Sequence, residues 1–174
     1  MEESDWSSDV CSSDLGAAQQ IVDANAGLAA AIELRLQASP QRIFDGILTP
    51  DDRFDFVFCN PPFHASARAA EAGSLRKWKN LGKAGNAESK PKMNFGGQAA
   101  ELWCEGGEAG FVGRMVAESA ERRTQVSWFS ALVSREESLP AIYSALKEVR
   151  ARRVETIAMA QGQKKSRIVA WQFG

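Results

Sequence analysis

The sequence predicts an α/β domain with a mostly parallel sheet and an antiparallel hairpin at its C-terminal end. Strand-like and helix-like segments alternate along the chain, and the strand-like segments are short and rich in aromatic and β-branched residues. A short polar turn joins the last two of them. At 174 residues, 44% hydrophobic and 25% charged, the chain has the composition of one ordinary globular domain with a real core.

The expected elements follow from local patterns. Residues 54–59 (FDFVFC) predict a strand that stops at Asn60, because the two prolines after it cannot continue a ladder. Residues 66–97 are weakly periodic and predict a long loop. The other expected elements are a helix over 17–26 ending at Gly27, a strand over 31–36, a helix over 98–120 with a break at Gly106 and Gly107, a strand over 125–133, a helix over 139–149 opened by Ser138 with Pro140 in its first turn, and strands over 154–160 and 167–173 joined by GQKKS.

Residues 1–15 differ in composition from the rest of the chain. They hold five serines and five acidic residues with almost no apolar periodicity, which predicts a disordered tail. The run DWSSDVCSSDL over 5–15 also resembles the in-frame translation of a sequencing-library adapter, and a natural acidic extension is the alternative. We therefore expect a non-native tail over 1–15 and a single domain over 16–174.

Cysteine and histidine usage argues against a metal site. Cys11, Cys59 and Cys104 lie far apart without a C-x-x-C pair, and His64 is the only histidine, so we expect reduced thiols and no metal. No apolar run approaches the roughly 20 residues that a membrane span needs, and acids stand where a secretory signal would be basic. These observations predict a cytoplasmic protein without a membrane partner.

Two segments concentrate positive charge although the net charge is −1. Residues 68–92 carry seven Lys or Arg against two acids, and residues 147–167 are also basic. Such clusters can form the footprint of a nucleic-acid backbone, and an ordinary solvated face is the alternative for both.

The tetrapeptide Asn60, Pro61, Pro62 and Phe63 carries the candidate chemistry. It follows a predicted strand, where open α/β sheets bind ligands. The side-chain oxygen of Asn60 and the carbonyl of Pro61 can each accept one hydrogen of an exocyclic aromatic amine, which favours a pyramidal nitrogen that attacks a methyl sulfonium. The prolines stiffen the turn, and Phe63 offers a face on which a base stacks. A plain strand-ending turn with a core aromatic is the alternative.

The segment FDFVFCNPPFHAS, followed by GSLRK, NFGGQ, ELWCEGGE, WFSALVS, QGQKKSR and AWQF, resembles the bacterial 23S ribosomal RNA adenine(1618)-N6 methyltransferase family over residues 16–174. The resemblance implies an incomplete class I (Rossmann-like) methyltransferase fold and S-adenosyl-L-methionine as the cofactor. It also implies that the acceptor is one adenine of large-subunit ribosomal RNA and that the protein is cytoplasmic. We expect a monomer.

The resemblance also implies roles for individual residues. Asn60, Pro61, Pro62 and Phe63 would be catalytic, with Asn60 also next to the cofactor. The implied substrate contacts are His64, Asn94, Phe95, Lys164, Lys165 and Arg167. A solvated histidine, a flexible linker over 94–97 and a solvated hairpin tip are the respective alternatives. We expect Glu101, Glu105 and Glu108 to face water or to pair with arginines, rather than to form a carboxylate pair for hydrolysis.

The sequence departs from the family pattern at its beginning, where the glycine-rich loop and the acid that hold the cofactor are missing. We expect the first two strands and their helix to be absent, which leaves the strand over 31–36 without a neighbour. The 174-residue chain is then expected to be aggregation-prone and inactive, and the activity to belong to its parent protein. A non-catalytic RNA-binding module and an N-methyltransferase of another planar amine or amide stay open as alternatives.

Overall fold

The computed structural model describes residues 8–62, 64–66, 103–161 and 164–174. The chain divides into two compact units, residues 1–49 and 50–174, and each is described by itself. Several residues singled out above lie outside the described part: Phe63, the basic segment 68–92, Asn94, Phe95 and Glu101. In the described part, no helix is long and apolar enough to cross a membrane.

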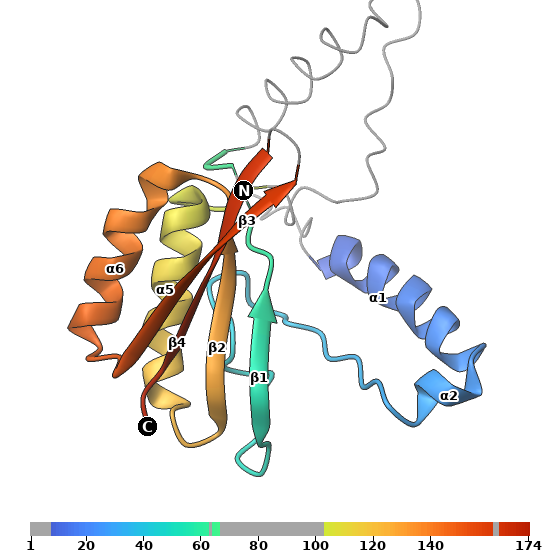
Figure 1. The fold of residues 1–174 in the computed structure, drawn as a ribbon. Coiled ribbons are helices and arrows are strands. Elements are labelled where there is room, and N and C mark those ends of the chain that lie inside the picture. The colour runs from blue at the N-terminus through green and yellow to red at the C-terminus, as the bar shows by residue number, and fades with distance from the viewer. Residues whose placement is uncertain (1–7, 63, 67–102, 162–163) are drawn as a thin grey trace, which may run out of the picture. The chain divides into compact units, whose positions relative to one another are not determined.

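The first unit contains two helices, α1 (Ser8–Asp23) and α2 (Ala26–Ala29) (Figure 1). The prediction of a disordered tail is wrong for residues 8–15, because α1 begins within that segment. Once the Ala- and Gln-rich segment that follows has formed a helix, each residue added at its end gains a backbone hydrogen bond at little further cost. Even Ser and Asp, which are modest helix formers, then take the helical conformation.

The helix α1 ends earlier than predicted. The Asn25 side-chain amide donates to the carbonyl oxygen of Ile21 at 2.7 Å, and the Ala24 backbone N–H donates to Gln20 at 3.0 Å. The amide of Asn25 satisfies one of the last carbonyls of the helix, which have no partner within it. Gly27 lies inside α2, so the prediction that the helix stops at Gly27 is wrong.

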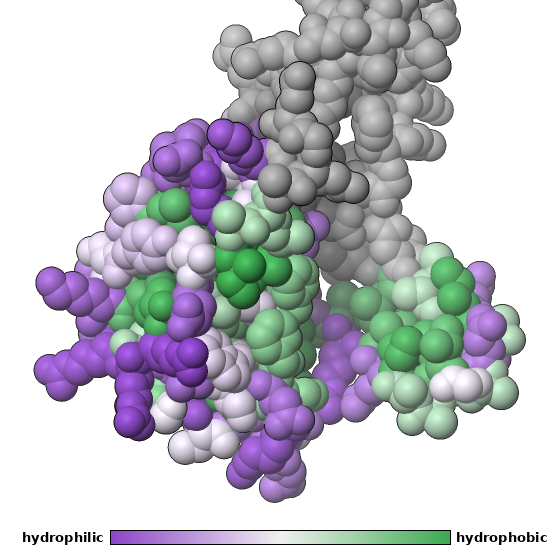
Figure 2. All heavy atoms as spheres, in the orientation of Figure 1, coloured by the Kyte–Doolittle hydropathy of each residue, from purple (hydrophilic) through white to green (hydrophobic). Residues whose placement is uncertain are grey.

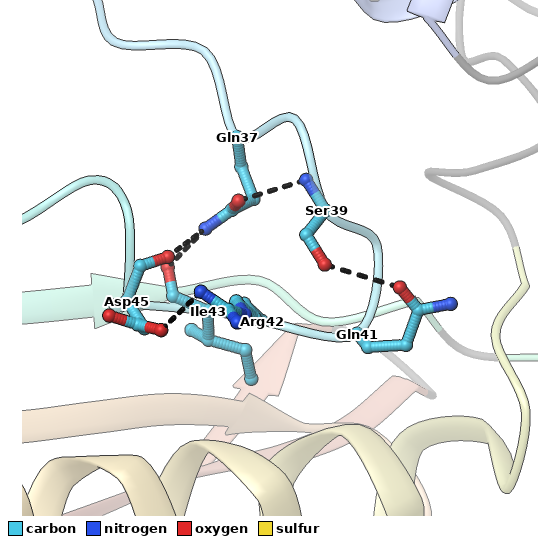
Figure 3. Close-up of polar contacts among 6 residues, drawn as sticks. All are labelled: Gln37, Ser39, Gln41, Arg42, Ile43 and Asp45. Atoms are coloured by element: carbon cyan, nitrogen blue, oxygen red, sulfur yellow. Dashed lines mark hydrogen bonds and ion pairs between the residues drawn. The ribbon is translucent and has the colours of Figure 1, made fainter.

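The strand predicted over 31–36 does not form, because no described strand pairs with this segment. Side chains take the place of ladder pairing here (Figure 3). The Gln37 amide donates to the carbonyl of Asp45 at 2.9 Å and accepts from the Ser39 backbone N–H at 3.0 Å. Arg35 donates to the carbonyl of Ile47 at 2.9 Å. The segment with alternating apolar and polar residues is therefore a loop, and side-chain hydrogen bonds hold it together.

The second unit is built on a four-stranded sheet with the strand order β1-β2-β4-β3. The strands are β1 (Phe54–Cys59), β2 (Val126–Val133), β3 (Arg153–Gln161) and β4 (Lys164–Gln172). β1 and β2 are parallel, whereas β4 is antiparallel to both β2 and β3. The four strands predicted within this unit and the C-terminal hairpin are thus confirmed. The described sheet is mixed rather than mostly parallel, because one of its three strand pairs is parallel and two are antiparallel.

Among the described residues, three helical segments accompany this sheet: α5 (Gly107–Glu121), η1 (Glu136–Ser138) and α6 (Leu139–Glu148). The predicted break at Gly106 and Gly107 is confirmed, since both have positive φ angles, 77° and 59°, and α5 begins there. The helix does not extend back over residues 103–105, where it was predicted. Pro140 lies in the first turn of α6 as predicted, but the Ser138 side chain makes no capping hydrogen bond.

The core lies between one face of the sheet and the two helices α5 and α6 (Figure 1). Phe129 and Trp171 are paired across β2 and β4, and their stacked rings lie 5.9 Å apart. The indole N–H of Trp171 donates to the Ser119 hydroxyl on α5 at 2.9 Å, and that hydroxyl donates to the carbonyl of Val116. A buried indole needs such a partner, and this one fixes α5 against β4.

The opposite face of the sheet exposes large apolar side chains. Phe54, Phe56 and Phe58 alternate along β1 toward this face, and Phe56 is 53% exposed. Ile157 on β3 belongs to the same face through its pairing with Ile168 and is 54% exposed. Figure 2 shows hydrophobic residues gathered over the β1 region, among hydrophilic ones. Within the described part of this unit, no helix covers these side chains.

A matched pair of phenylalanine substitutions distinguishes the two faces. We expect Phe129→Ala to lower the free energy of unfolding by about 3–5 kcal/mol, because the side chain is fully buried and would leave a cavity. Phe56→Ala should cost only about 1 kcal/mol, since half of its surface is already in water. Urea unfolding followed by near-UV circular dichroism measures both. Equal losses would contradict the described assignment of the core face.

Candidate functional site

Asn60 lies at the carboxyl end of β1, as predicted. The register of the parallel pair places Cys59 beside Ala131 on β2, and the Ser130 hydroxyl donates to the carbonyl of Val57 at 2.9 Å. Asn60 itself is exposed, whereas Pro61 and Pro62 are buried. The turn is therefore anchored by its prolines while the Asn60 side chain stays accessible to a ligand.

The other predicted basic contacts lie at the same edge of the sheet. Because β4 is antiparallel to β2, its first residues meet the carboxyl end of β2, where Arg167 pairs with Val133. Lys164 and Lys165 pair with residues at the end of β3, so they belong to a strand, and the predicted turn over GQKKS is too long. Two strand spacings, about 10 Å, separate β1 from β4. The structure thus brings this basic segment and Asn60 to one edge.

The basic side chains at this edge are not equivalent. The Arg167 guanidinium donates to a carboxylate oxygen of Glu136 at 3.1 Å, and its side chain is only 16% exposed. Lys165 is exposed. A phosphate contact by Arg167 would compete with its existing ion pair, whereas Lys165 faces solvent. The contacts expected of both residues stay predictions.

His64 is positioned by a segment that sequence reasoning gave no role. Trp103 forms an isolated parallel bridge with His64, and the Cys104 backbone N–H donates to the carbonyl of His64 at 3.0 Å. A Cβ atom at Gly107 would lie only 3.4 Å from Ala65. The absence of a side chain at Gly107 therefore lets the two segments pass this close to each other. The indole N–H of Trp103 is buried without a hydrogen-bond partner among the described residues. The segment 103–107 therefore lies against His64 and Ala65, which follow the tetrapeptide in the sequence.

Glu108, in the first turn of α5, is the main correction to the expected site. It was expected to face water or to pair with an arginine side chain, but it is only 2% exposed. One carboxylate oxygen accepts from the Ser134 backbone N–H at 2.7 Å and from its hydroxyl at 2.6 Å, and the other accepts from the Arg135 backbone N–H at 3.1 Å. The sequence signal for these hydrogen bonds was an acidic residue directly after the Gly-Gly pair that opens the helix. Glu105 is exposed, as expected.

Burial raises the pKa of the Cys59 thiol to about 11. The residue before Asn60 is therefore a neutral thiol at physiological pH and contributes no charge to the site. Among the described residues, no group of three or more His, Cys, Asp or Glu side chains is placed to hold a metal ion. Asn60, the one residue predicted to contact the cofactor, lies in the described part of the site, and that contact stays a prediction.

The sequence matches the profile of a family described as RNA methyltransferase over residues 3–174. It is 52% identical over 172 residues to ribosomal RNA large subunit methyltransferase F of Methylobacillus flagellatus, covering 90% of this chain and 50% of that protein. The protein of the same name from Pectobacterium carotovorum is 55% identical over 157 residues, with 90% and 49% covered. The chain therefore spans about half the length of the curated relatives it matches.

Solved structures show the same fold. The hMettl16 catalytic domain in complex with MAT2A 3′UTR hairpin 1 superposes with a TM-score of 0.70 at 24% identity, covering 92% of this chain and 52% of that one. The N-terminal domain of human METTL16 in complex with SAH gives a TM-score of 0.61 at 19% identity, with 92% and 48% covered. These likenesses confirm the predicted Rossmann-like methyltransferase fold.

The raised pKa of Cys59 makes a testable statement about its reactivity. A Cys11→Ser, Cys104→Ser variant leaves Cys59 as the one cysteine of the chain. In this variant, the rate of alkylation by iodoacetamide should reach half its maximum near pH 11. The thiolate is the reactive form, and burial disfavours it until the pH exceeds that value. The same variant in urea should titrate near its ordinary value of 9.0. A half-maximum near 9 in the folded chain would contradict the described burial.

Proposed function

The chain belongs to the RNA methyltransferase family, and from this premise we propose that it forms the acceptor side of an enzyme that methylates the N6 amine of adenine in large-subunit ribosomal RNA. Within that class we propose adenine 1618 of 23S ribosomal RNA as the target and the cytoplasm as the place of action. We propose that the enzyme works as a monomer. The observation that carries the proposal is the exposed Asn60 on a turn whose two prolines are buried.

The geometry of this turn suits an aromatic amine. The lone pair of an adenine N6 is delocalised into the ring, so the nitrogen is a weak nucleophile. Hydrogen bonds from its two N–H groups to the Asn60 side-chain oxygen and the Pro61 carbonyl favour a pyramidal nitrogen with a localised lone pair. Both acceptors are preset by the prolines, so little reorganisation remains at the moment of reaction. After transfer, the cationic nitrogen loses one proton to water and becomes the neutral methylated amine.

S-adenosylmethionine, the donor we propose, supplies an electrophilic methyl group when bound. The described residues fit this cofactor only in part. β1 is followed by Asn60 and Pro61 and β2 by Ser134, so neither strand leads into a glycine-rich loop. We therefore assign the acceptor half of the reaction, and no donor contact beyond Asn60, to this part of the chain.

Ribosomal RNA as the partner is supported by the edge that carries Asn60. Lys164 and Lys165 begin β4 at that edge, and Lys165 is exposed. Lysine side chains at this position can bind the phosphate backbone and orient a strand whose base enters the site. The two relatives described above carry a ribosomal RNA large subunit methyltransferase name, and hMettl16 was solved with an RNA hairpin.

A second candidate is an RNA-binding module without catalysis, for the 174-residue chain tested alone. The observation that favours it is the absence of a glycine-rich loop after β1 or β2 in the described residues. We propose that the chain alone binds ribosomal RNA and transfers no methyl group. Such binding would weaken steeply with salt.

A graft tests the proposed reaction. The chain replaces the matching segment of the Methylobacillus flagellatus relative, with which it is 52% identical. We expect the graft to transfer a tritiated methyl group from S-adenosylmethionine to bacterial 23S ribosomal RNA that lacks the modification. Asn60→Ala should lower kcat by about 100-fold or more, because an acceptor that acts in the transition state is lost. The matched control is Asn25→Ala, which replaces an asparagine of the first unit and should keep full activity.

Mapping of the methylated position completes this test. Label at N6 of adenine 1618 supports the full proposal, and label at another adenine refutes the proposed target alone. An Asn60→Ala graft as active as its parent would refute the assigned role of the tetrapeptide. Methyl transfer by the 174-residue chain alone would refute the second candidate.

A further inference from the structure

We propose that Arg135 is a further RNA-contacting residue of the site, a phosphate contact held in position by the buried carboxylate of Glu108. The inference rests on the proposed function, because it adds a contact to the same RNA-binding edge. The motifs quoted from the sequence include Ser134 but not Arg135. The chemistry of the contact is the pairing of an arginine guanidinium with a nucleic-acid phosphate.

The position of Arg135 follows from the strand register. Ala131 on β2 pairs with Cys59 on β1, so the chain beyond Val133 continues past the level of Asn60 at the same edge. β2 lies between β1 and β4 in the sheet, and Val133 pairs with Arg167 on β4. The loop that begins at Ser134 thus leaves the sheet at the same edge as Asn60, from the strand next to β1. An RNA backbone running from β4 to Asn60 would pass over it.

The side chain of Arg135 is free to bind a ligand. It is exposed, and its guanidinium has no hydrogen-bond or ion-pair partner among the described residues. Arg167, on the neighbouring strand, is instead engaged with Glu136. A guanidinium offers five N–H donors in a planar fork that matches two phosphate oxygens. At this edge, Arg135 is therefore better placed than Arg167 to receive a phosphate.

The backbone of Arg135 is held by an unusually well-bonded buried carboxylate. Both oxygens of Glu108 are used, one by the Ser134 N–H and hydroxyl and the other by the Arg135 N–H. A buried carboxylate left without these donors would be strongly destabilising, so the loop is held in the conformation that supplies them. Glu108 is thus a positioning residue. It sets where the Arg135 side chain leaves the backbone, and the ordering of that backbone is complete before RNA binds.

The acids of the same loop do not cancel this positive charge. Glu136 is the ion-pair partner of Arg167. Glu137 is exposed in η1 and carries the other negative charge of the loop. Among the described residues of this edge, Arg135 follows the end of β2 and Lys165 lies on the neighbouring strand β4, and both are exposed, so an RNA backbone that crosses these two strands meets a cation on each.

Salt-dependent RNA binding tests the contact. The probe is a fluorescent transcript of the 23S ribosomal RNA segment around adenine 1618, titrated with the 174-residue chain. We expect Arg135→Ala to weaken binding roughly tenfold near 0.1 M salt and to reduce the slope of log K against log salt by about one, the signature of one lost phosphate contact. Arg152→Ala is the matched control. It removes an exposed arginine just before β3, at the opposite edge, and should leave the slope unchanged.

The role of Glu108 is tested by whether its substitution strengthens or weakens RNA binding. Glu108→Gln can keep the acceptor oxygen for Ser134, but its amide N–H2 then faces the Arg135 N–H, and that hydrogen bond is lost. Removing a negative charge near RNA would by itself tighten binding, whereas loss of positioning weakens it and reduces the salt slope as Arg135→Ala does. In a variant that carries both Glu108→Gln and Arg135→Ala, the second substitution should cause no further loss of RNA affinity. Ser134→Ala, which removes only a bond to the other oxygen, should leave the slope unchanged.

Each result bears on one of the two proposals. If the unsubstituted 174-residue chain binds the RNA segment and the Arg135→Ala variant binds it with the same affinity and the same salt slope, the inference is refuted and the proposed function stands. Tighter binding by a folded Glu108→Gln variant, with folding checked by circular dichroism, would refute the positioning role. If the graft transfers no methyl group, the proposed reaction fails, whatever the RNA binding of Arg135→Ala.

Discussion

The parallel pairing of β1 with β2 is the constraint on which the candidate site depends. Two parallel strands cannot be joined by a tight turn, so the chain must cross over, and in this unit α5 is part of that crossover. The pairing places the ends of both strands at one edge. Asn60 and the loop at Ser134 consequently become neighbours although they are far apart in the sequence. The antiparallel β4 then brings its first residues to the same edge.

The helix α5 connects the core to that edge. Toward its C-terminal end, Ser119 accepts a hydrogen bond from the buried Trp171. At its N-terminal end, Glu108 accepts three hydrogen bonds from the loop after β2. A helix fixed at both ends against the sheet cannot shift without breaking buried polar contacts, which are costly to leave unpaired. Packing on the helical face of the sheet therefore holds the loop after β2 in place, while the other face leaves the phenylalanines of β1 exposed.

Elements set by local chemistry were predicted well from the sequence. Two prolines end β1 after Cys59, a Gly-Gly pair opens α5, and Pro140 lies in the first turn of α6. The segment 31–36 was predicted wrongly because alternation describes a strand only when a neighbour pairs with it. The helical start of α1 was missed for a related reason: residues 8–15 are weak helix formers that extend a helix begun elsewhere.

The sequence by itself determined the tetrapeptide, its place at the end of a strand and the family to which its motifs point, because prolines and short strand patterns act through local geometry. Tertiary structure alone decided which residues share the edge with Asn60. The burial of Glu108 and its bonds to Ser134 and Arg135 join segments about 26 residues apart. A carboxylate beside two glycines has the same local sequence whether it faces water or accepts buried hydrogen bonds. Only the packing of α5 against the end of β2 removes water from it and turns an ordinary surface acid into a fixed part of the site.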